Sequence, residues 1–148
     1  AALWVRISHT DWVEGGWDTA ESVELARALR ALGADLIDVS SGGLSELQEI
    51  PTGPLYQVPG AEAVRRGADI PVAAVGLITT PAEAQSIIRD GKADVVLLAR
   101  AVLRDPHWPL RAAEALDATD RLQSPPQYQR GWGRYPLHDA TAEPMPPI

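Results

Sequence analysis

Three short stretches of the chain repeat one pattern, and this pattern constrains the fold more than any other feature. They read Gly33-Ala34-Asp35-Leu36-Ile37, Gly67-Ala68-Asp69-Ile70-Pro71-Val72 and Gly91-Lys92-Ala93-Asp94-Val95-Val96. A glycine suits the left-handed position that ends a helix, and the apolar run after each Ala-Asp is typical of a buried strand. Each repeat therefore predicts the end of a helix followed by a strand.

The flanking residues extend this pattern into four βα units. Helical periodicity covers residues 20–32 and 81–90, and both segments start with a capping-box spacing, Asp18 to Glu21 and Thr80 to Glu83. Weaker helices are expected over residues 61–66 and 109–116. The expected strands are residues 3–7, 36–39, 72–75 and 95–98, and their nearly continuous apolar runs predict a parallel sheet covered on both faces.

The composition changes near residue 124, where prolines become frequent. We therefore divide the chain into an α/β unit of residues 1–123 and a Pro-rich extended arm and tail of residues 124–148. A chain of 148 residues can bury about 70% of its unfolded surface, enough for one domain. It begins with Ala1, without an initiator methionine, and opens on a strand-like stretch, so we expect it to be a piece of something longer.

Charge and composition exclude several classes of function. The net charge is −7 and the basic residues are scattered, which argues against a nucleic-acid partner. The chain has no cysteine, so it has no disulfide framework or thiolate metal site, and no metal site is expected. No apolar run reaches the length of a membrane span, and we expect a cytoplasmic protein without a membrane partner.

Residues suited to an anion collect where the predicted strands end. In parallel α/β folds these ends meet on one edge, and here they carry Ser40, Gly76 and the pair Ala99-Arg100. Small residues let backbone N–H groups approach an anion, and arginine adds a permanent cation. On the phosphate-site template of (βα)8 barrels, residues 101–103 form the short extra helix and Arg100 binds a phosphate. An ordinary structural role for Arg100, either an ion pair with a nearby carboxylate such as Asp105 or the capping of a helix, remains equally open.

Other polar and aromatic residues near the first strand are ambiguous. Arg6 lies inside an apolar strand, and a buried arginine needs an anionic partner, which can be a ligand or a side chain. His9 could act as an acid, a base or a ligand, although a loop histidine is the commoner case. Trp12 and Trp17 are expected to pack over the first helix. The dinucleotide fingerprint and the P-loop motif are absent.

Five segments taken together resemble a known family. VRISHTDWVEGG, DLIDVSSGGL, PVAAVGLIT, LLARAVLRDPHW and PPQYQRGW follow one another in the order found in the C-terminal half of Old Yellow Enzyme proteins. The match runs from about residue 3 to residue 132 and is most similar to the bacterial, thermophilic-like ene-reductases. The resemblance implies a (βα)8 TIM barrel of which this chain supplies strands five to eight. It also implies FMN, NADPH or NADH as hydride donor, and reduction of the C=C bond of an enone substrate.

The resemblance assigns roles to residues at the strand ends and in the arm. It places Arg6 against the flavin ring near N1 and the C2 oxygen, and Ser40 near the ribityl chain or the phosphate. The amides of Gly76 and Ala99 and the guanidinium of Arg100 would hold the phosphate, although the family commonly has Gly-Arg where this chain has Ala99-Arg100. Two further residues, Arg130 and Trp132, match the arm that reaches the active site of a neighbouring subunit.

No catalytic residue of the family is expected in this chain. The proton-donating tyrosine and the residues that grip the substrate carbonyl belong to the family's N-terminal half, so the resemblance implies a complementary N-terminal half-barrel and a homo-oligomer as partners. Two alternatives stay open. One is a non-catalytic half-barrel that binds a phosphorylated ligand and closes its sheet by self-association. The other is an α/β domain whose arginines only pair internally.

Overall fold

A four-stranded parallel sheet forms the centre of the protein. The computed structural model describes residues 1–122 and 125–128. The strands are β1 (Trp4–Ser8), β2 (Leu36–Ser40), β3 (Val72–Ala74) and β4 (Val95–Val96), and they lie side by side in chain order. Each neighbouring pair is parallel. This arrangement confirms the predicted succession of βα units and is that of a partial (βα)8 barrel.

Helices connect the strands and follow the last one. They are α1 (Thr19–Ala31), α2 (Val58–Ala68), α3 (Pro81–Arg89), α4 (Arg100–Arg104) and α5 (Trp108–Ala115), with short 3-10 turns at η1 (Thr119–Arg121) and η2 (Pro126–Tyr128). The expected short helix after the fourth strand is α4. Both predicted capping boxes are present, at Asp18 and at Thr80. The weak helix expected over 61–66 is longer, because Pro59 stands in the first turn, where its missing N–H costs nothing.

The repeated aspartate ties neighbouring strands together at their starts. Asp35 Oδ2 accepts a hydrogen bond from the Leu3 amide (2.7 Å), and Asp94 Oδ2 accepts one from the Val72 amide (3.0 Å). In return, the backbone N–H of Asp35 donates to the Leu3 carbonyl and that of Asp94 donates to the Val72 carbonyl. Arg65 also grips Asp94 through two nitrogens, and this hydrogen bonding holds the pKa of the carboxyl below its usual range. Two of the three repeats thus connect neighbouring strands in the same way.

The middle repeat differs from the expectation at its glycine. Gly33 and Gly91 adopt positive φ after their helices, as predicted, but Gly67 lies within α2 and Asp69 takes the left-handed position (φ 51°). A Cβ at Gly67 would lie 2.5 Å from Val23 Cγ1 on α1. This glycine therefore permits two helices to approach closely, and the turn after α2 depends on Asp69.

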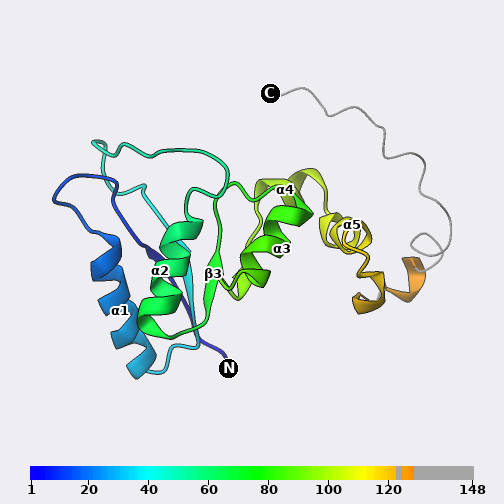
Figure 1. Ribbon diagram of the computed structural model, residues 1–148, viewed down its shortest axis with the longest axis horizontal. Helices are drawn as coiled ribbons and strands as arrows, with labels where there is room; N and C mark the ends of the chain where they lie inside the picture. The colour runs from blue at the N-terminus through cyan, green and yellow to red at the C-terminus, as the bar shows by residue number, and fades with distance from the viewer. Residues whose placement is uncertain (123–124, 129–148) are drawn as a thin grey trace.

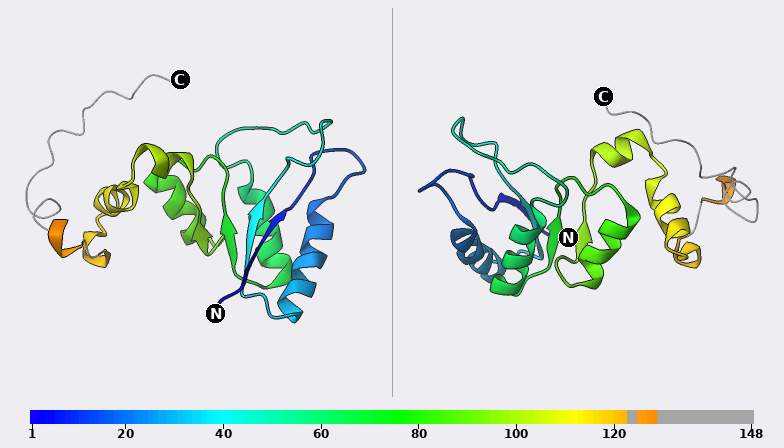
Figure 2. Two further views of the ribbon diagram at one scale, coloured as in Figure 1. Left: turned by 180° about the vertical axis from the view of Figure 1, so that it is seen from behind. Right: turned by 45° about the horizontal axis from the view of Figure 1, so that its top comes forward.

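The core lies between the sheet and one layer of helices. Alternate strand residues, including Val5, Ile37, Val39, Val72 and Ala74, pack with Ala26, Val64 and Ile87 of the helices in one apolar cluster. Figure 1 shows α1 and α2 side by side in front of the sheet, and Figure 2 shows the strands uncovered from behind.

The prediction of a sheet covered on both faces is therefore wrong for the described part of the chain. The second face carries Trp4, which is 52% exposed, and Arg6. Figure 2 shows no described helix over this face of the sheet.

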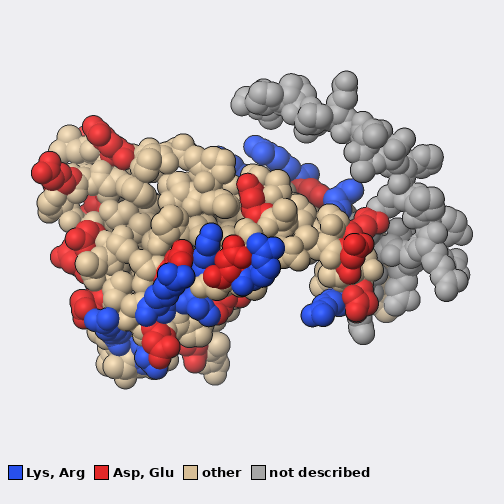
Figure 3. Space-filling view, in the orientation of Figure 1, with Lys and Arg blue, Asp and Glu red and all other residues tan. Residues whose placement is uncertain are grey.

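The helix-covered side carries many charges that neutralise one another. Figure 3 shows basic and acidic side chains interspersed over the helices. Arg27 pairs with Glu24, Arg30 with Asp69, and Arg66 with Glu62. Exposed pairs of this kind contribute little to stability, but they leave no large patch of one sign on this face.

Candidate functional site

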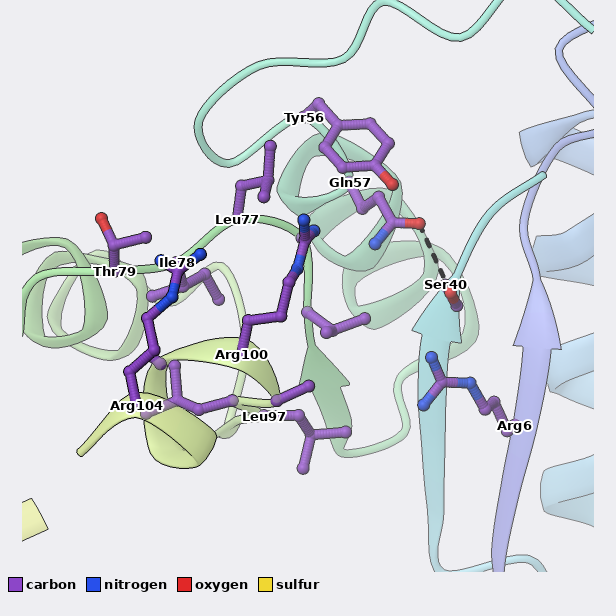
Figure 4. Close-up of a pocket in the computed structure, with 15 residues that line it drawn as sticks. Arg6, Ser40, Tyr56, Gln57, Leu77, Ile78, Thr79, Leu97, Arg100 and Arg104 are labelled. Atoms are coloured by element: carbon purple, nitrogen blue, oxygen red, sulfur yellow. Dashed lines mark hydrogen bonds between the residues drawn. The ribbon is translucent and has the colours of Figure 1, made fainter. Parts of the chain in front are cut away.

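The carboxyl ends of the strands open into a pocket of about 310 Å³ (Figure 4). Its walls come from β1, the end of β2, the residues just before α2, the β3–α3 loop, the β4–α4 loop and α4. The structure brings together in this pocket all five residues predicted to hold a cofactor: Arg6, Ser40, Gly76, Ala99 and Arg100. Parallel strands explain the convergence, since their carboxyl ends share one edge of the sheet.

Arg100 opens α4 and contributes its guanidinium to the pocket. Asp105, the alternative partner considered for it, pairs with Arg111 at 2.8 Å instead. Among the described residues no carboxylate lies within ion-pair distance of Arg100. The alternative of an Arg100–Asp105 ion pair is thus wrong, and the cation remains available to a ligand.

Arg104 is a second cation at the pocket that sequence reasoning missed. It lies one helical turn after Arg100 on α4, and the described residues give it no ion pair either. Its spacing of four residues from Arg100 was a usable signal, because residues at i and i+4 share a helix face. Figure 4 shows both arginine side chains extending from this short helix.

Gly76 allows the backbone to turn sharply into the pocket. Its φ of +123° is a conformation that other residues rarely adopt, and Leu77 follows with a φ of +52°. A Cβ at Gly76 would also lie 2.9 Å from Gln57 Nε2. Both the backbone angle and the close neighbour therefore require glycine here.

Gln57 is a buried polar residue of the pocket that no sequence pattern indicated. It is only 4% exposed, although it stands just before Val58 at the start of α2. Its Oε1 accepts hydrogen bonds from Ser41 Oγ (2.6 Å) and, at a longer distance, from Ser40 Oγ (3.4 Å). These contacts turn the Nε2 donor toward Gly76 and the pocket. Ser40 is therefore engaged with a protein side chain at the pocket wall.

Arg6 is not the buried residue that its apolar strand suggested. Its side chain is 56% exposed on the uncovered face of the sheet, and its Nη1 donates to Asp38 Oδ2 at 2.9 Å. The strand register places Arg6 directly beside Asp38. The partner that the sequence left undecided is thus an aspartate on the neighbouring strand. The guanidinium still lines the pocket.

His9 is buried away from the pocket, against α2. It is 4% exposed, its Nδ1 lies 3.0 Å from Thr19 Oγ1, and its backbone N–H donates to the Ser40 carbonyl. A Cβ at Gly60 would clash with His9 Nε2, so the ring fills the space that this glycine leaves. Burial lowers the pKa of His9 and favours the neutral ring. Its role is therefore structural, in line with the loop-residue alternative.

Trp17 packs over the first helix, as predicted, whereas Trp12 packs against two other rings. Trp17 Nε1 donates to Ser22 Oγ on α1, and Trp12 contacts the rings of His9 and Tyr56.

The predicted intersubunit residues Arg130 and Trp132 lie outside the described residues. Within residues 1–122 and 125–128 no group of acidic or histidine side chains could hold a metal ion. In that same part, no helix is long and apolar enough to cross a membrane.

Comparison with known proteins identifies the family. A family model described as NADH:flavin oxidoreductase / NADH oxidase matches residues 1–119. The chain belongs to this family. Membership confirms the resemblance to Old Yellow Enzyme proteins, and FMN with a nicotinamide hydride donor, the expected cofactors, are those of the family.

Several curated relatives are NADPH dehydrogenases. The chain is 46% identical to one from a Geobacillus species, 43% to one from Geobacillus thermodenitrificans and 44% to one from Halalkalibacterium halodurans, each over 130 residues. These matches cover 88% of this chain but 37% to 38% of each relative. The chain thus spans less than two fifths of the length of these relatives.

One solved structure shows a more distant similarity. It is wild-type GGGPS from Thermoplasma volcanium, with a TM-score of 0.46 and 18% identity over 73% of this chain and 40% of that chain. At this level the similarity supports no conclusion about function.

The burial of His9 predicts how stability depends on pH. Because its pKa is lower in the folded chain than in the unfolded chain, the unfolded chain binds more protons below the unfolded value of about 6.5. Above about pH 6.5, the titration of His9 should not change the free energy of unfolding. Below that it should fall by up to about 1.4 kcal/mol per pH unit until the folded pKa is reached.

Denaturant titrations between pH 7.5 and pH 5 would measure this slope. The variant His9→Gln should be less stable at pH 7.5, because it loses packing against Gly60, but its curve should be flatter. A wild-type curve as flat as that of the variant would contradict the assigned burial.

Proposed function

We propose that this chain is the FMN-binding part of an NAD(P)H-dependent ene-reductase that reduces the C=C bond of α,β-unsaturated carbonyl compounds. Family membership supports flavin-dependent oxidoreduction, and the similarity to thermophilic-like ene-reductases in five segments supports the substrate class. In this proposal the residues that complete the reaction lie outside this sequence, which spans 37% of the length of one curated relative.

The charge of the pocket is the observation that carries the proposal. The whole chain is acidic, with 20 Asp and Glu against 13 Lys and Arg. The described residues that line the pocket nevertheless include three arginines, Arg6, Arg100 and Arg104, and no acidic residue. A site with this charge balance favours an anionic ligand.

The available donors suit the phosphate of FMN. Forked guanidinium donors bind phosphate oxygens in pairs, and charge-assisted hydrogen bonds are the stronger ones. Arg100 and Arg104 supply the cations, and the turn at Gly76 and the uncapped start of α4 at Ala99 supply backbone N–H groups. Ser40 would face the ribityl chain, and Arg6 would lie beside the flavin ring.

The chemistry that FMN would supply in this pocket is the transfer of a hydride from the nicotinamide to the substrate. The residues of this chain bind and orient the cofactor and set its electrostatic surroundings, and a cation at Arg6 would stabilise the negative charge of the reduced ring. We assign no catalytic proton donor to this chain. That group and the groups that bind the carbonyl would come from the complementary N-terminal half.

The partners of the chain are part of the same proposal. Of the described strands, β1 pairs only with β2 and β4 only with β3, so both edges of the sheet are free to pair with further strands. A complementary N-terminal half-barrel would occupy them. We further propose a homo-oligomer in which Arg130 and Trp132 reach a neighbouring active site, and a cytoplasmic location. The alternative of a half-barrel without redox chemistry is not favoured, because the family is one of flavin oxidoreductases.

Reconstitution tests the proposed function directly. The chain would be purified alone and together with an N-terminal half taken from a related NADPH dehydrogenase, and the flavin absorption band and the NADPH-dependent reduction of 2-cyclohexenone would be recorded. We expect the pair to retain FMN and to reduce the enone. If the folded pair holds no flavin, the proposal fails. Flavin with NADPH oxidation but no enone reduction would refute the substrate class alone.

Replacement of Arg100 separates the phosphate contact from the rest of the site. Arg100→Ala should weaken FMN binding by about tenfold to a hundredfold, because a hydrogen bond to a charged group contributes about 1.5–3 kcal/mol. Riboflavin has no phosphate, so its affinity should change far less. Titrations of both ligands would measure the difference, with Arg111→Ala, which removes an arginine outside the pocket, as the matched control. Equal losses for the two ligands would refute the role of Arg100.

A further inference from the structure

The ion pair between Arg6 and Asp38 lies next to the pocket, and its two side chains differ in their exposure to solvent. Arg6 is 56% exposed and lines the pocket, whereas the side chain of Asp38 is 13% exposed and does not line it. The strand register fixes the two residues side by side on β1 and β2. The cation therefore faces the ligand site, and its counter-charge lies behind it within the sheet.

Asp38 is poorly screened in this position. Its Oδ2 accepts from Arg6 Nη1, and its Oδ1 is buried without a hydrogen-bond partner among the described residues. A carboxylate with so little contact with water or donors keeps a strong field in its neighbourhood, because the local dielectric is low. Its negative charge therefore opposes the field of Arg6 at any group bound next to the guanidinium.

We propose that Asp38 is an electrostatic counter-charge that lowers the reduction potential of a flavin bound beside Arg6. The proposal rests on the proposed function, since it requires flavin in this pocket. Arg6 stabilises the negative charge of the reduced ring, and Asp38 offsets part of that stabilisation. With both residues present, the reduction potential of the flavin should therefore lie below the value for Arg6 without Asp38 and above the value for a site without Arg6.

A simple holding role for Asp38 makes the opposite prediction. If Asp38 served only to keep Arg6 in place, its loss would resemble the loss of Arg6, and both changes would lower the potential. If Asp38 acts as a counter-charge, the two changes shift the potential in opposite directions. The sign of the shift therefore distinguishes the two roles without reference to activity.

The test compares midpoint potentials of flavin-loaded protein, formed from the chain and its complementary half. Asp38→Asn keeps the size of the side chain and an oxygen that can accept from Arg6, but it removes the charge. We expect its two-electron reduction to become about tenfold more favourable, a shift of about 30 mV to more positive potential. Arg6→Gln should shift the potential to more negative values. The double variant should lie between Arg6→Gln and the wild type, because Asp38 offsets only part of the effect of Arg6.

Glu24→Gln is the matched control, because it removes one negative charge from the exposed pair with Arg27 on α1. Its potential should equal that of the wild type.

Two results would overturn the inference. One is a potential in Asp38→Asn that is unchanged or more negative while the variant is folded and loaded with flavin. The other is an equal rise in Glu24→Gln, which would assign the effect to overall charge. Failure of the wild-type assembly to hold flavin would overturn the proposed function itself and is recognised by the absence of the flavin band.

Discussion

Parallel pairing of four consecutive strands is the constraint on which the rest of the structure depends. It brings the carboxyl ends of β1 to β4 to one edge of the sheet, so residues far apart in sequence line one pocket. The same register sets Arg6 beside Asp38. Asp35 and Asp94 support the pairing at the opposite ends of the strands, where they accept hydrogen bonds from the amides of Leu3, just before β1, and Val72, the first residue of β3. A shift of one residue would turn Arg6 toward the helices and dismantle the pocket.

Much of this organisation could be predicted because local patterns determine it. The helix that ends at Gly91 and the strand that follows are determined by periodicity and a left-handed glycine, and both capping boxes formed as their spacing indicated. Four of the five predicted cofactor residues lie at strand exits, which a parallel sheet brings together, and Arg6 joins them from within β1. Family resemblance supplied their individual roles, which binding measurements have to test.

Other features depend on contacts between distant parts of the chain, which periodicity does not reveal. Gln57 enters the pocket because Ser40 and Ser41, on another strand exit, orient its amide. Arg6 looked buried because its neighbours are apolar, yet its face of the sheet has no covering layer in the described part of the chain. Gly67 matched a helix stop by sequence, but it serves a close approach between α1 and α2. In each case the deciding partner is remote in sequence.

A crystal structure of the flavin-loaded assembly tests the central claim most directly, namely that the exits of β2, β3 and β4, together with Arg6 of β1, form one flavin-binding pocket that holds the phosphate. Our account predicts the FMN phosphate between the backbone amides at Gly76 and Ala99 and the guanidinium of Arg100, with the flavin ring beside Arg6. A phosphate bound elsewhere, or a flavin ring on the helix-covered side of the sheet, would contradict it.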